Sequence, residues 1–259
     1  MKNKKIKKIF ESKNKKPIVC LTAYSATIAQ ILDKHCDIIL VGDSLGTVLY
    51  NMKSTQEVTL DMIINHAKSV RKSISKSTFV VDMPHKTYRN KKEAYQNAKK
   101  IIKLTKCDAL KLEGGKKILN IVKYLIKKNI SVMGHIGLLP QSERGKFRFK
   151  GRNKIERKKI INDAMLLSEA GVFAIVIECV EESLAKIISK SIPVPTIGIG
   201  ASKHCDGQIL VTDDMLGLSN FTPRFVKKYL NMRNIINKSV SKYKQDVIKK
   251  NFPSKQYIY

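Results

Sequence analysis

The sequence predicts an α/β protein that forms a single closed (β/α)8 barrel of the TIM type. Three observations favour this fold: a length of 259 residues, eight apolar runs of strand length, and stretches of helical spacing between them. Such barrels typically take roughly 250 residues. Continuous apolar strands that alternate with helices indicate a parallel sheet covered on its outer face. An open doubly wound sheet would produce a similar pattern, but eight βα units favour closure.

The elements are predicted from apolar periodicity. The predicted strands are residues 18–22, 38–41, 79–82, 109–112, 131–133, 174–177, 196–199 and 209–211. The predicted helices are residues 25–34, 60–73, 91–104, 116–128, 154–170 and 181–190. The connection between the seventh and eighth strands is too short for a full helix.

One domain is expected over residues 1–259, because no internal repeat or low-complexity linker marks a boundary. Residues 1–15 form a basic N-terminal segment, and residues 221–259 are expected to form a helical C-terminal extension packed outside the barrel. Residues 138–153 form a long interruption after the fifth strand. A mobile lid and an ordinary surface excursion both fit this interruption.

The composition points to a cytoplasmic protein. No apolar run approaches the roughly 18 residues of a membrane span, and the basic N-terminus lacks the apolar stretch of a signal peptide. The five cysteines are odd in number and contain no CxxC pair. They are typical of free thiols in a reducing compartment.

The net charge of +29, from 50 Lys and Arg against 21 Asp and Glu, raises the possibility of nucleic-acid binding. The bases are mostly Lys, however, and are scattered beside Ile and Asn through every segment. The chain has no Trp and only 7% aromatic residues, whereas a nucleic-acid groove concentrates Arg and stacking aromatics. We therefore expect a solvated basic surface and no nucleic-acid partner.

Four of the scarce acidic residues, Asp43, Asp82, Glu113 and Glu178, occur at or just after the carboxyl ends of predicted strands. In a barrel these strand ends meet at one mouth, so the four carboxylates would face one cavity. Such a cluster is costly unless a cation compensates it. Oxygen ligands without a His/Cys cluster favour Mg²⁺ over Zn²⁺.

Three further residues accompany the acids. Lys111 precedes Glu113 by two positions, so strand alternation points both side chains the same way. Lys111 either binds an anionic substrate or forms a structural ion pair. His135 ends the fifth strand and either donates a hydrogen bond to a substrate oxygen or is a satisfied core histidine. Ser44 follows Asp43 in a tight turn suited to holding a carboxylate.

Nine motifs occur in an order that closely resembles the ketopantoate hydroxymethyltransferase family, from about residue 15 to 230. They are LTAYSA (21–26), VGDSLG (41–46), DMP (82–84), KLEGG (111–115), GHIGLLPQS (134–142), KGR (150–152), IECV (177–180), IGIGAS (197–202) and DGQILV (206–211).

The resemblance implies a reaction and its residues. A hydroxymethyl group would pass from 5,10-methylenetetrahydrofolate to 3-methyl-2-oxobutanoate, giving 2-dehydropantoate in pantothenate synthesis. It implies that Asp43 and Asp82 bind Mg²⁺ with Glu113 as the third acid, and that Glu178 accepts the proton. Ser44 and Lys111 resemble the groups that hold the substrate. With His135 and the two aspartates, they complete the expected substrate-binding set. Family members are cytoplasmic homo-oligomers, often decamers.

Three other functions compete with this interpretation. A Mg²⁺-dependent lyase of the phosphoenolpyruvate-mutase kind would carry a catalytic Cys in a mobile loop, and residues 138–153 contain none. A basic nucleic-acid-binding protein with a degenerate barrel would not depend on Asp82. A folded remnant without turnover would not need to retain all four acids.

Overall fold

The computed structural model describes residues 3–143, 148–219 and 222–259. The chain divides into two compact units, residues 1–211 and residues 212–259. The predicted lid falls partly on residues 144–147, which lie outside the described residues. The expectation of one domain over the whole chain stays a prediction.

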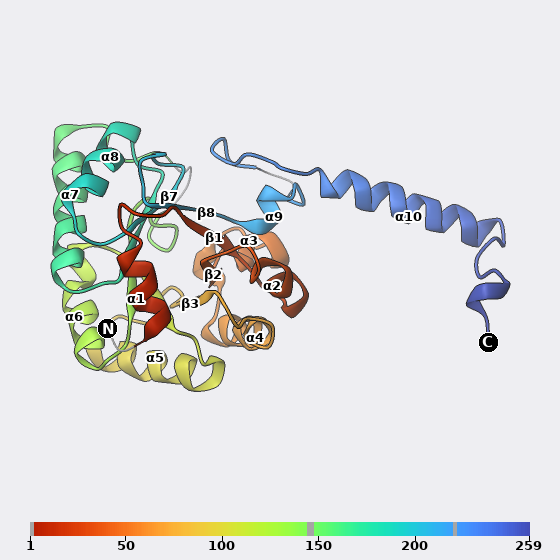
Figure 1. Ribbon diagram of the computed structural model, residues 1–259, viewed down its shortest axis with the longest axis horizontal. Helices are drawn as coiled ribbons and strands as arrows, with labels where there is room; N and C mark the ends of the chain where they lie inside the picture. Colours follow the sequence, from red (N-terminus) through yellow and green to blue (C-terminus); the bar gives the residue numbers. More distant parts are fainter. Residues whose placement is uncertain (1–2, 144–147, 220–221) are drawn as a thin grey trace. The chain divides into compact units, whose positions relative to one another are not determined.

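The first unit contains a closed barrel of eight parallel strands, in the order β1 to β8 around the ring. This confirms the predicted (β/α)8 fold, and helices surround the strands (Figure 1). The strands are β1 (Ile18–Thr22), β2 (Ile38–Val41), β3 (Thr78–Asp82), β4 (Ala109–Glu113), β5 (Val132–Gly137), β6 (Ala174–Glu178), β7 (Thr196–Ile199) and β8 (Gly207–Leu210).

The helices of the barrel follow the strands as predicted, with additional short elements. They are α2 (Ala26–Leu32), α3 (Leu45–Tyr50), η1 (Thr55–Glu57), α4 (Leu60–Arg71), α5 (Lys91–Thr105), η2 (Lys116–Ile118), α6 (Leu119–Lys127), α7 (Lys154–Glu169) and α8 (Glu182–Ser191). Side chains of Ser25, Thr59, Asn90 and Asn153 accept hydrogen bonds from the first turns of α2, α4, α5 and α7. These caps explain where the helices begin.

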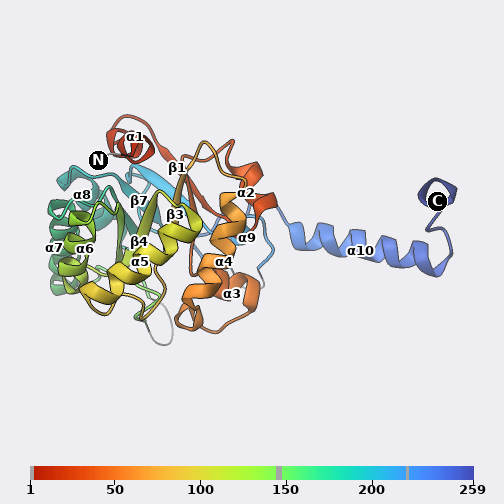
Figure 2. The same cartoon turned by 90° about the horizontal axis from the view of Figure 1, so that it is seen from below.

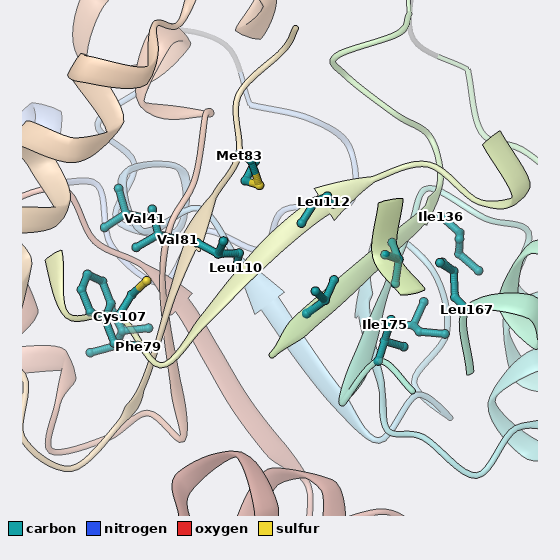
Figure 3. Close-up of a cluster of buried hydrophobic side chains, with 14 of the residues drawn as sticks. Val41, Phe79, Val81, Met83, Cys107, Leu110, Leu112, Ile136, Leu167 and Ile175 are labelled. Atoms are coloured by element: carbon teal, nitrogen blue, oxygen red, sulfur yellow. The ribbon is translucent and has the colours of Figure 1, made fainter. Parts of the chain in front are cut away.

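Strand alternation divides the core into two layers. One set of strand residues belongs to the core cluster shared with the surrounding helices, and Ile175 lies beside Leu167 of α7 in this cluster (Figure 3). The alternate set fills the barrel interior, and includes Val80, Ala109, Met133 and Val176. The side-chain register of each strand therefore decides which residues reach the barrel mouth.

The basic N-terminal segment forms helix α1 (Lys4–Glu11), which extends the interior core. Ile6 and Ile9 are buried in the same cluster as the interior strand residues. The Lys5 ammonium donates to the carbonyls of Ser75 and Ser77, just before β3. Helix α1 therefore closes the amino-terminal end of the barrel (Figure 2).

The second unit contains α9 (Thr212–Met215), α10 (Met232–Ile248) and η3 (Lys255–Tyr257). None of the residues of α10 is buried. Among the described residues, no helix combines the length and the apolar character needed to cross a bilayer.

The eighth strand begins two residues earlier than the sequence pattern predicts. Gly207 pairs with Ile18 of β1, and a β-carbon at Gly207 would lie 2.4 Å from the Ile18 carbonyl oxygen. Glycine at this position lets the two backbones approach closely. Apolar periodicity misses this residue because glycine carries no side chain.

Candidate active site

The acids predicted from strand ends lie on the inward register of the barrel. Asp82 follows Val80 by two residues, and Glu178 likewise follows Val176, so both point to the side of the interior core. Lys111 and Glu113 continue the interior register of Ala109 on β4. The carboxyl ends of β3, β4 and β6 therefore bring these groups to one mouth.

Lys111 lies between two acids. Its Nζ is 2.8 Å from Asp82 Oδ1 and 3.8 Å from Glu113 Oε1, and all three side chains are almost completely buried. The β3–β4 register explains the shorter contact, because Asp82 and Lys111 are directly paired. Attraction to Asp82, Glu113 and Asp43 outweighs burial and raises the pKa of Lys111, which keeps the ammonium charged.

His135 on β5 connects the acids to Glu178. Its Nδ1 lies 3.3 Å from Glu113 Oε1, and its Nε2 lies 3.2 Å from Glu178 Oε2. The second contact lacks the alignment of a hydrogen bond. Burial and Lys111 oppose protonation of the ring, but Glu113 and Glu178 raise the pKa of His135 to about 9. The two acids therefore favour the protonated ring, whereas the Lys111 ammonium, 3.4 Å from Nδ1, opposes it.

Asp43 and Ser44 lie in the turn from β2 into α3. The backbone N–H of Asp43 donates to Asp82 Oδ2 at 3.0 Å, which joins the ends of two neighbouring strands. The Ser44 hydroxyl lies 2.7 Å from the hydroxyl of Tyr24, a buried residue at the end of β1. The predicted tight turn is thus the first turn of a helix, and Tyr24 positions its serine.

Gln141 was not predicted as a site residue, yet it contacts two of the acids, Asp43 and Glu113. Its Nε2 donates to Asp43 Oδ2 at 2.7 Å and to the Met83 carbonyl at 3.0 Å. Its Oε1 accepts from the Tyr88 hydroxyl at 2.5 Å, and its backbone N–H donates to Glu113 Oε2 at 3.0 Å. The only sequence signal was its place in the GLLPQS motif.

The structure thus brings the sequence-predicted site residues to one mouth. Ser44 hydrogen-bonds to Tyr24 and is linked to the acids through its neighbour Asp43. Glu178 is the most accessible of the acids, with 17% of its side chain exposed. Asp43, Asp82, Lys111, Glu113 and His135 are all buried.

The pKa values of Asp43 and Asp82 are raised by burial and in part by the negative charge of the neighbouring acids. Burial raises the pKa of Asp43 well above its usual range, and the charges of Asp82 and Glu113 raise it further. Burial also raises the pKa of Asp82, although Lys111 opposes this shift. Glu113 differs, because His135 and Lys111 overcome burial and lower its pKa. Additional positive charge at Asp43 and Asp82 would relieve their repulsion.

The donor set fits a hard divalent cation. Three carboxylates supply oxygen atoms of the kind that Mg²⁺ prefers. Asp82 Oδ1 is buried and ion-paired, yet it makes no hydrogen bond with the described part of the chain. Across residues 3–143, 148–219 and 222–259, no three acidic, His or Cys side chains are already grouped as metal ligands. Lys111 contacts Asp82 and Glu113, and Gln141 contacts Asp43 and Glu113.

A basic cavity of about 460 Å³ borders the start of α7. Arg148, Phe149, Lys150 and Arg152 contribute to its lining. The backbone N–H of Lys150 donates to the carbonyl of Cys179 at 2.7 Å, one residue after Glu178. Lys150, which lines the cavity, is therefore joined through its backbone to the residue after β6.

The fold and the site together define a barrel enzyme whose charged residues converge at the carboxyl ends of the strands, where such barrels carry out catalysis. The chain belongs to the ketopantoate hydroxymethyltransferase family, whose model matches residues 3–255.

Curated relatives agree with this assignment. The chain is 61% identical over 257 residues to a 3-methyl-2-oxobutanoate hydroxymethyltransferase of Pelagibacter ubique, covering 99% of this chain and 100% of the relative. It is 48% identical to the enzyme of the same name from Phenylobacterium zucineum, covering 94% and 90% of the two chains.

Solved structures with little sequence identity share the fold. Phosphonopyruvate hydrolase in complex with oxalate and Mg²⁺ has a TM-score of 0.64 at 9% identity, covering 97% of this chain and 92% of that one. For 2,3-dimethylmalate lyase, of the PEP mutase/isocitrate lyase superfamily, the TM-score is 0.63 at 9% identity, with coverages of 98% and 87%. At this identity the likeness extends to the barrel alone, so the lyase alternative gains no support from it.

Proposed function

We propose that the protein catalyses an aldol-type hydroxymethyl transfer. In this reaction 3-methyl-2-oxobutanoate, 5,10-methylenetetrahydrofolate and water give 2-dehydropantoate and tetrahydrofolate, a step of pantothenate synthesis. The observation that carries the proposal is the arrangement of Glu178, which is partly exposed and 3.2 Å from His135, beside the buried group of Asp43, Asp82 and Glu113. Family membership and the names of the relatives support the substrates.

The substrate anion would bind among the positive and polar groups of the mouth. Lys111 is charged and buried, and Ser44 offers a hydroxyl at a helix start. We assign to these two residues the carboxylate and oxo oxygen of the substrate. Asp43, Asp82 and Glu113 would hold Mg²⁺, and Asp43 and Asp82 would also belong to the substrate-binding set. When bound, Mg²⁺ would stabilise the negative charge that develops on the oxo oxygen.

The proton transfer is assigned to Glu178. A proton on C3, next to the oxo group, passes to a Glu178 carboxylate oxygen, and the C3 electron pair then bonds to the methylene carbon of the folate. The two bonds from that carbon to folate nitrogens break, and water supplies the hydroxyl group of the product. The proton taken from C3 and one proton of the water replace the methylene carbon on the two nitrogens, which gives tetrahydrofolate. His135 Nε2 lies 3.2 Å from Glu178 Oε2 without a hydrogen bond to it, so its N–H would be available to donate to a substrate oxygen beside the carboxylate. A positioned carboxylate that accepts a proton contributes about 10² to 10⁴-fold to such a rate.

The test is deuterium exchange at C3 of 3-methyl-2-oxobutanoate, followed by NMR in D₂O with Mg²⁺ and without folate. We expect exchange that requires Mg²⁺ and falls at least about 100-fold in Glu178→Gln, as loss of a general base implies. Glu182→Gln is the matched control, because Glu182 begins α8 and its carboxylate accepts a hydrogen bond from Ser202. Exchange that persists in Glu178→Gln would exclude this residue as the proton acceptor.

The folate co-substrate is assigned to the basic cavity beside β6. A folate carries a flat ring system and a carboxylate tail, and Arg148, Lys150, Arg152 and Phe149 offer matching charge and an aromatic face. The Arg148→Ala/Arg152→Ala variant should raise KM more for a polyglutamylated than for a monoglutamylated folate. An equal effect on both would contradict a role in tail binding.

We also propose that the protein is a cytoplasmic homo-oligomer, with a decamer expected from the family resemblance. Five free cysteines, four of them buried, are consistent with a reducing compartment. Helix α10 carries exposed apolar side chains at helical spacing, at positions 235, 236, 240, 243 and 247, which suits an interface between copies. Light scattering coupled to size exclusion gives the subunit number directly.

A further inference from the structure

Gln141 is a buried amide whose polar groups are all used. It is 2% exposed, and its side chain bonds to Asp43, Met83 and Tyr88. An amide has two N–H donors and one acceptor oxygen. Both donors face acceptors, and the oxygen faces the O–H of Tyr88. The reverse orientation would point the amide oxygen at a carboxylate and a carbonyl, so one orientation is fixed.

The bonds of Gln141 reach three neighbouring strand ends. Asp43 follows β2, Met83 follows β3 and Glu113 ends β4, while Gln141 itself lies in the segment after β5. The side chain holds Asp43 Oδ2, and the backbone N–H holds Glu113 Oε2. One residue therefore restrains two of the acids against rotation. It also neutralises part of their repulsion with N–H dipoles rather than with a charge.

We infer that Gln141 is a positioning residue of the cation site: it sets the orientation of Asp43 and Glu113, and Tyr88 fixes the orientation of Gln141. Gln141 contacts one oxygen of each acid, Asp43 Oδ2 and Glu113 Oε2. The other Glu113 oxygen, Oε1, lies 3.3 Å from His135 Nδ1 and 3.8 Å from Lys111 Nζ. The inference rests on the proposed function for the identity of the cation as Mg²⁺. The hydrogen bonds that carry it do not depend on that proposal.

A structural role alone would predict a different result from a positioning role. Loss of packing lowers the thermal stability of the metal-free protein, whereas loss of orientation weakens cation binding. Replacing groups that orient metal ligands typically lowers metal affinity or activity about 10 to 100-fold. The deficit of a positioning variant should also shrink when the cation is saturating.

The experiment is a calorimetric titration of the full-length protein with MgCl₂, in the presence of a fixed concentration of 3-methyl-2-oxobutanoate. Gln141→Met keeps the length of the side chain and removes its hydrogen bonds. Tyr88→Phe removes the O–H that donates to the amide oxygen at 2.5 Å and that also lies 3.4 Å from the Glu113 backbone carbonyl, and it leaves the Gln141 side chain in place. Ser142→Ala is the matched control, because Ser142 is the exposed neighbour of Gln141.

We expect the Mg²⁺ Kd to rise about 10 to 100-fold in Gln141→Met and by a smaller factor in Tyr88→Phe, with no change in Ser142→Ala. Excess Mg²⁺ should recover kcat in both variants, while the metal-free Tm of Tyr88→Phe stays close to the wild-type value. Equal Kd values in Tyr88→Phe, Gln141→Met and Ser142→Ala would overturn the inference. If Gln141→Met does not fold, the Tyr88→Phe comparison decides alone. Wild-type protein that binds no Mg²⁺ would instead contradict the proposed function.

Discussion

Lys111 is the residue on which the charge balance of the mouth depends. It is buried beside Asp82 and Glu113, and its charge opposes the rise in the Asp43 and Asp82 pKa values. A buried ion pair is a weak net source of stability, but removal of one partner leaves an uncompensated charge. Lys111 is therefore structurally important in the metal-free protein, in addition to any contact with substrate.

Lys111→Met should destabilise the metal-free protein by about 3 to 5 kcal/mol, because the acids lose their counter-charge in a buried site. Chemical unfolding in the presence of EDTA measures this difference. The double variant Lys111→Met/Asp82→Asn removes the unpaired charge as well and should recover part of the loss. A double variant as unstable as the sum of the two singles would show that the pair does not interact.

Asp206 of the DGQILV motif does not belong to the mouth, and its carboxylate instead stabilises the fold. Its Oδ2 accepts from Lys13 Nζ at 2.7 Å and from the Thr196 N–H at 2.8 Å, and its Oδ1 accepts from the Asn14 N–H. Burial disfavours the charged form, but Lys13 and the backbone donors lower the pKa of Asp206 overall. The carboxylate thus ties the segment after α1 to β7.

The contribution of Asp206 should depend on pH in a defined direction. Its pKa is lower in the folded than in the unfolded chain, so the stabilisation is complete above the ordinary Asp value of about 3.9 and is lost below it. Asp206→Asn should lower Tm at pH 7, and the difference from wild type should narrow as the pH falls below about 4. Melting curves from pH 3 to 7 measure this. A difference that is constant over that range would exclude the ionised carboxylate as its source.

The residues at the mouth could be predicted from the sequence where they lie at the end of a predicted strand. Asp82, Glu113 and Glu178 end apolar strands, and parity along each strand fixes their direction. Gln141 and Tyr88 were not predictable, because neither follows a strand directly and polar residues in a loop have no periodicity. Their partners are set by how the segment after β5 folds back on β2 to β4.

Helix α1 is rich in Lys, yet it contributes buried side chains to the core of the barrel. Residues 1–15 are rich in Lys, yet Ile6 and Ile9 lie on one face and complete the core of the barrel interior. The lysines occupy the other face. The amphipathic pattern of this segment is hard to predict from the sequence, because a helix of eight residues has only two buried positions, Ile6 and Ile9.

Ile6→Ala should destabilise the protein by about 2 to 5 kcal/mol, because it leaves a cavity beneath the barrel interior. Ile9→Ala should act in the same way. Lys7→Ala is the control, since Lys7 is 63% exposed in its pair with Glu11 and surface changes stay within about 0.5 kcal/mol. Equal unfolding free energies for Ile6→Ala and Lys7→Ala would show that α1 does not close the barrel.

The boundaries of most elements were predicted within one or two residues, since apolar runs and capping side chains both mark them. Helix α3 was not predicted. It begins at Leu45 within the VGDSLG motif, where two glycines at 42 and 46 favour a turn on local propensity alone. The segment forms a helix because Leu45 is buried and Gly46 packs closely against Val58 and Met52. Tertiary packing thus overrides the local signal.

The chain as a whole carries a net charge of +29, whereas four carboxylates gather at the mouth of the barrel. The four carboxylates of the mouth belong to only 21 acidic residues in the chain. The proposed substrates are anions. The positive net charge of the chain attracts them over long distances, whereas the carboxylates at the mouth repel them unless a cation is bound there. These two effects differ in range, because solvent-exposed charges are screened over about 10 Å at 0.1 M salt, whereas buried pairs are screened less.

Ionic strength should therefore change the encounter with substrate more than the chemistry. We expect kcat/KM for 3-methyl-2-oxobutanoate to fall as salt rises from 0.02 to about 0.5 M, through a higher KM, with kcat nearly constant because the buried ion pairs persist. Steady-state kinetics at saturating Mg²⁺ and folate measure both constants. Two salts with different anions at the same ionic strength separate screening from competition by one anion. A KM that is independent of ionic strength would mean that the basic surface does not guide the substrate.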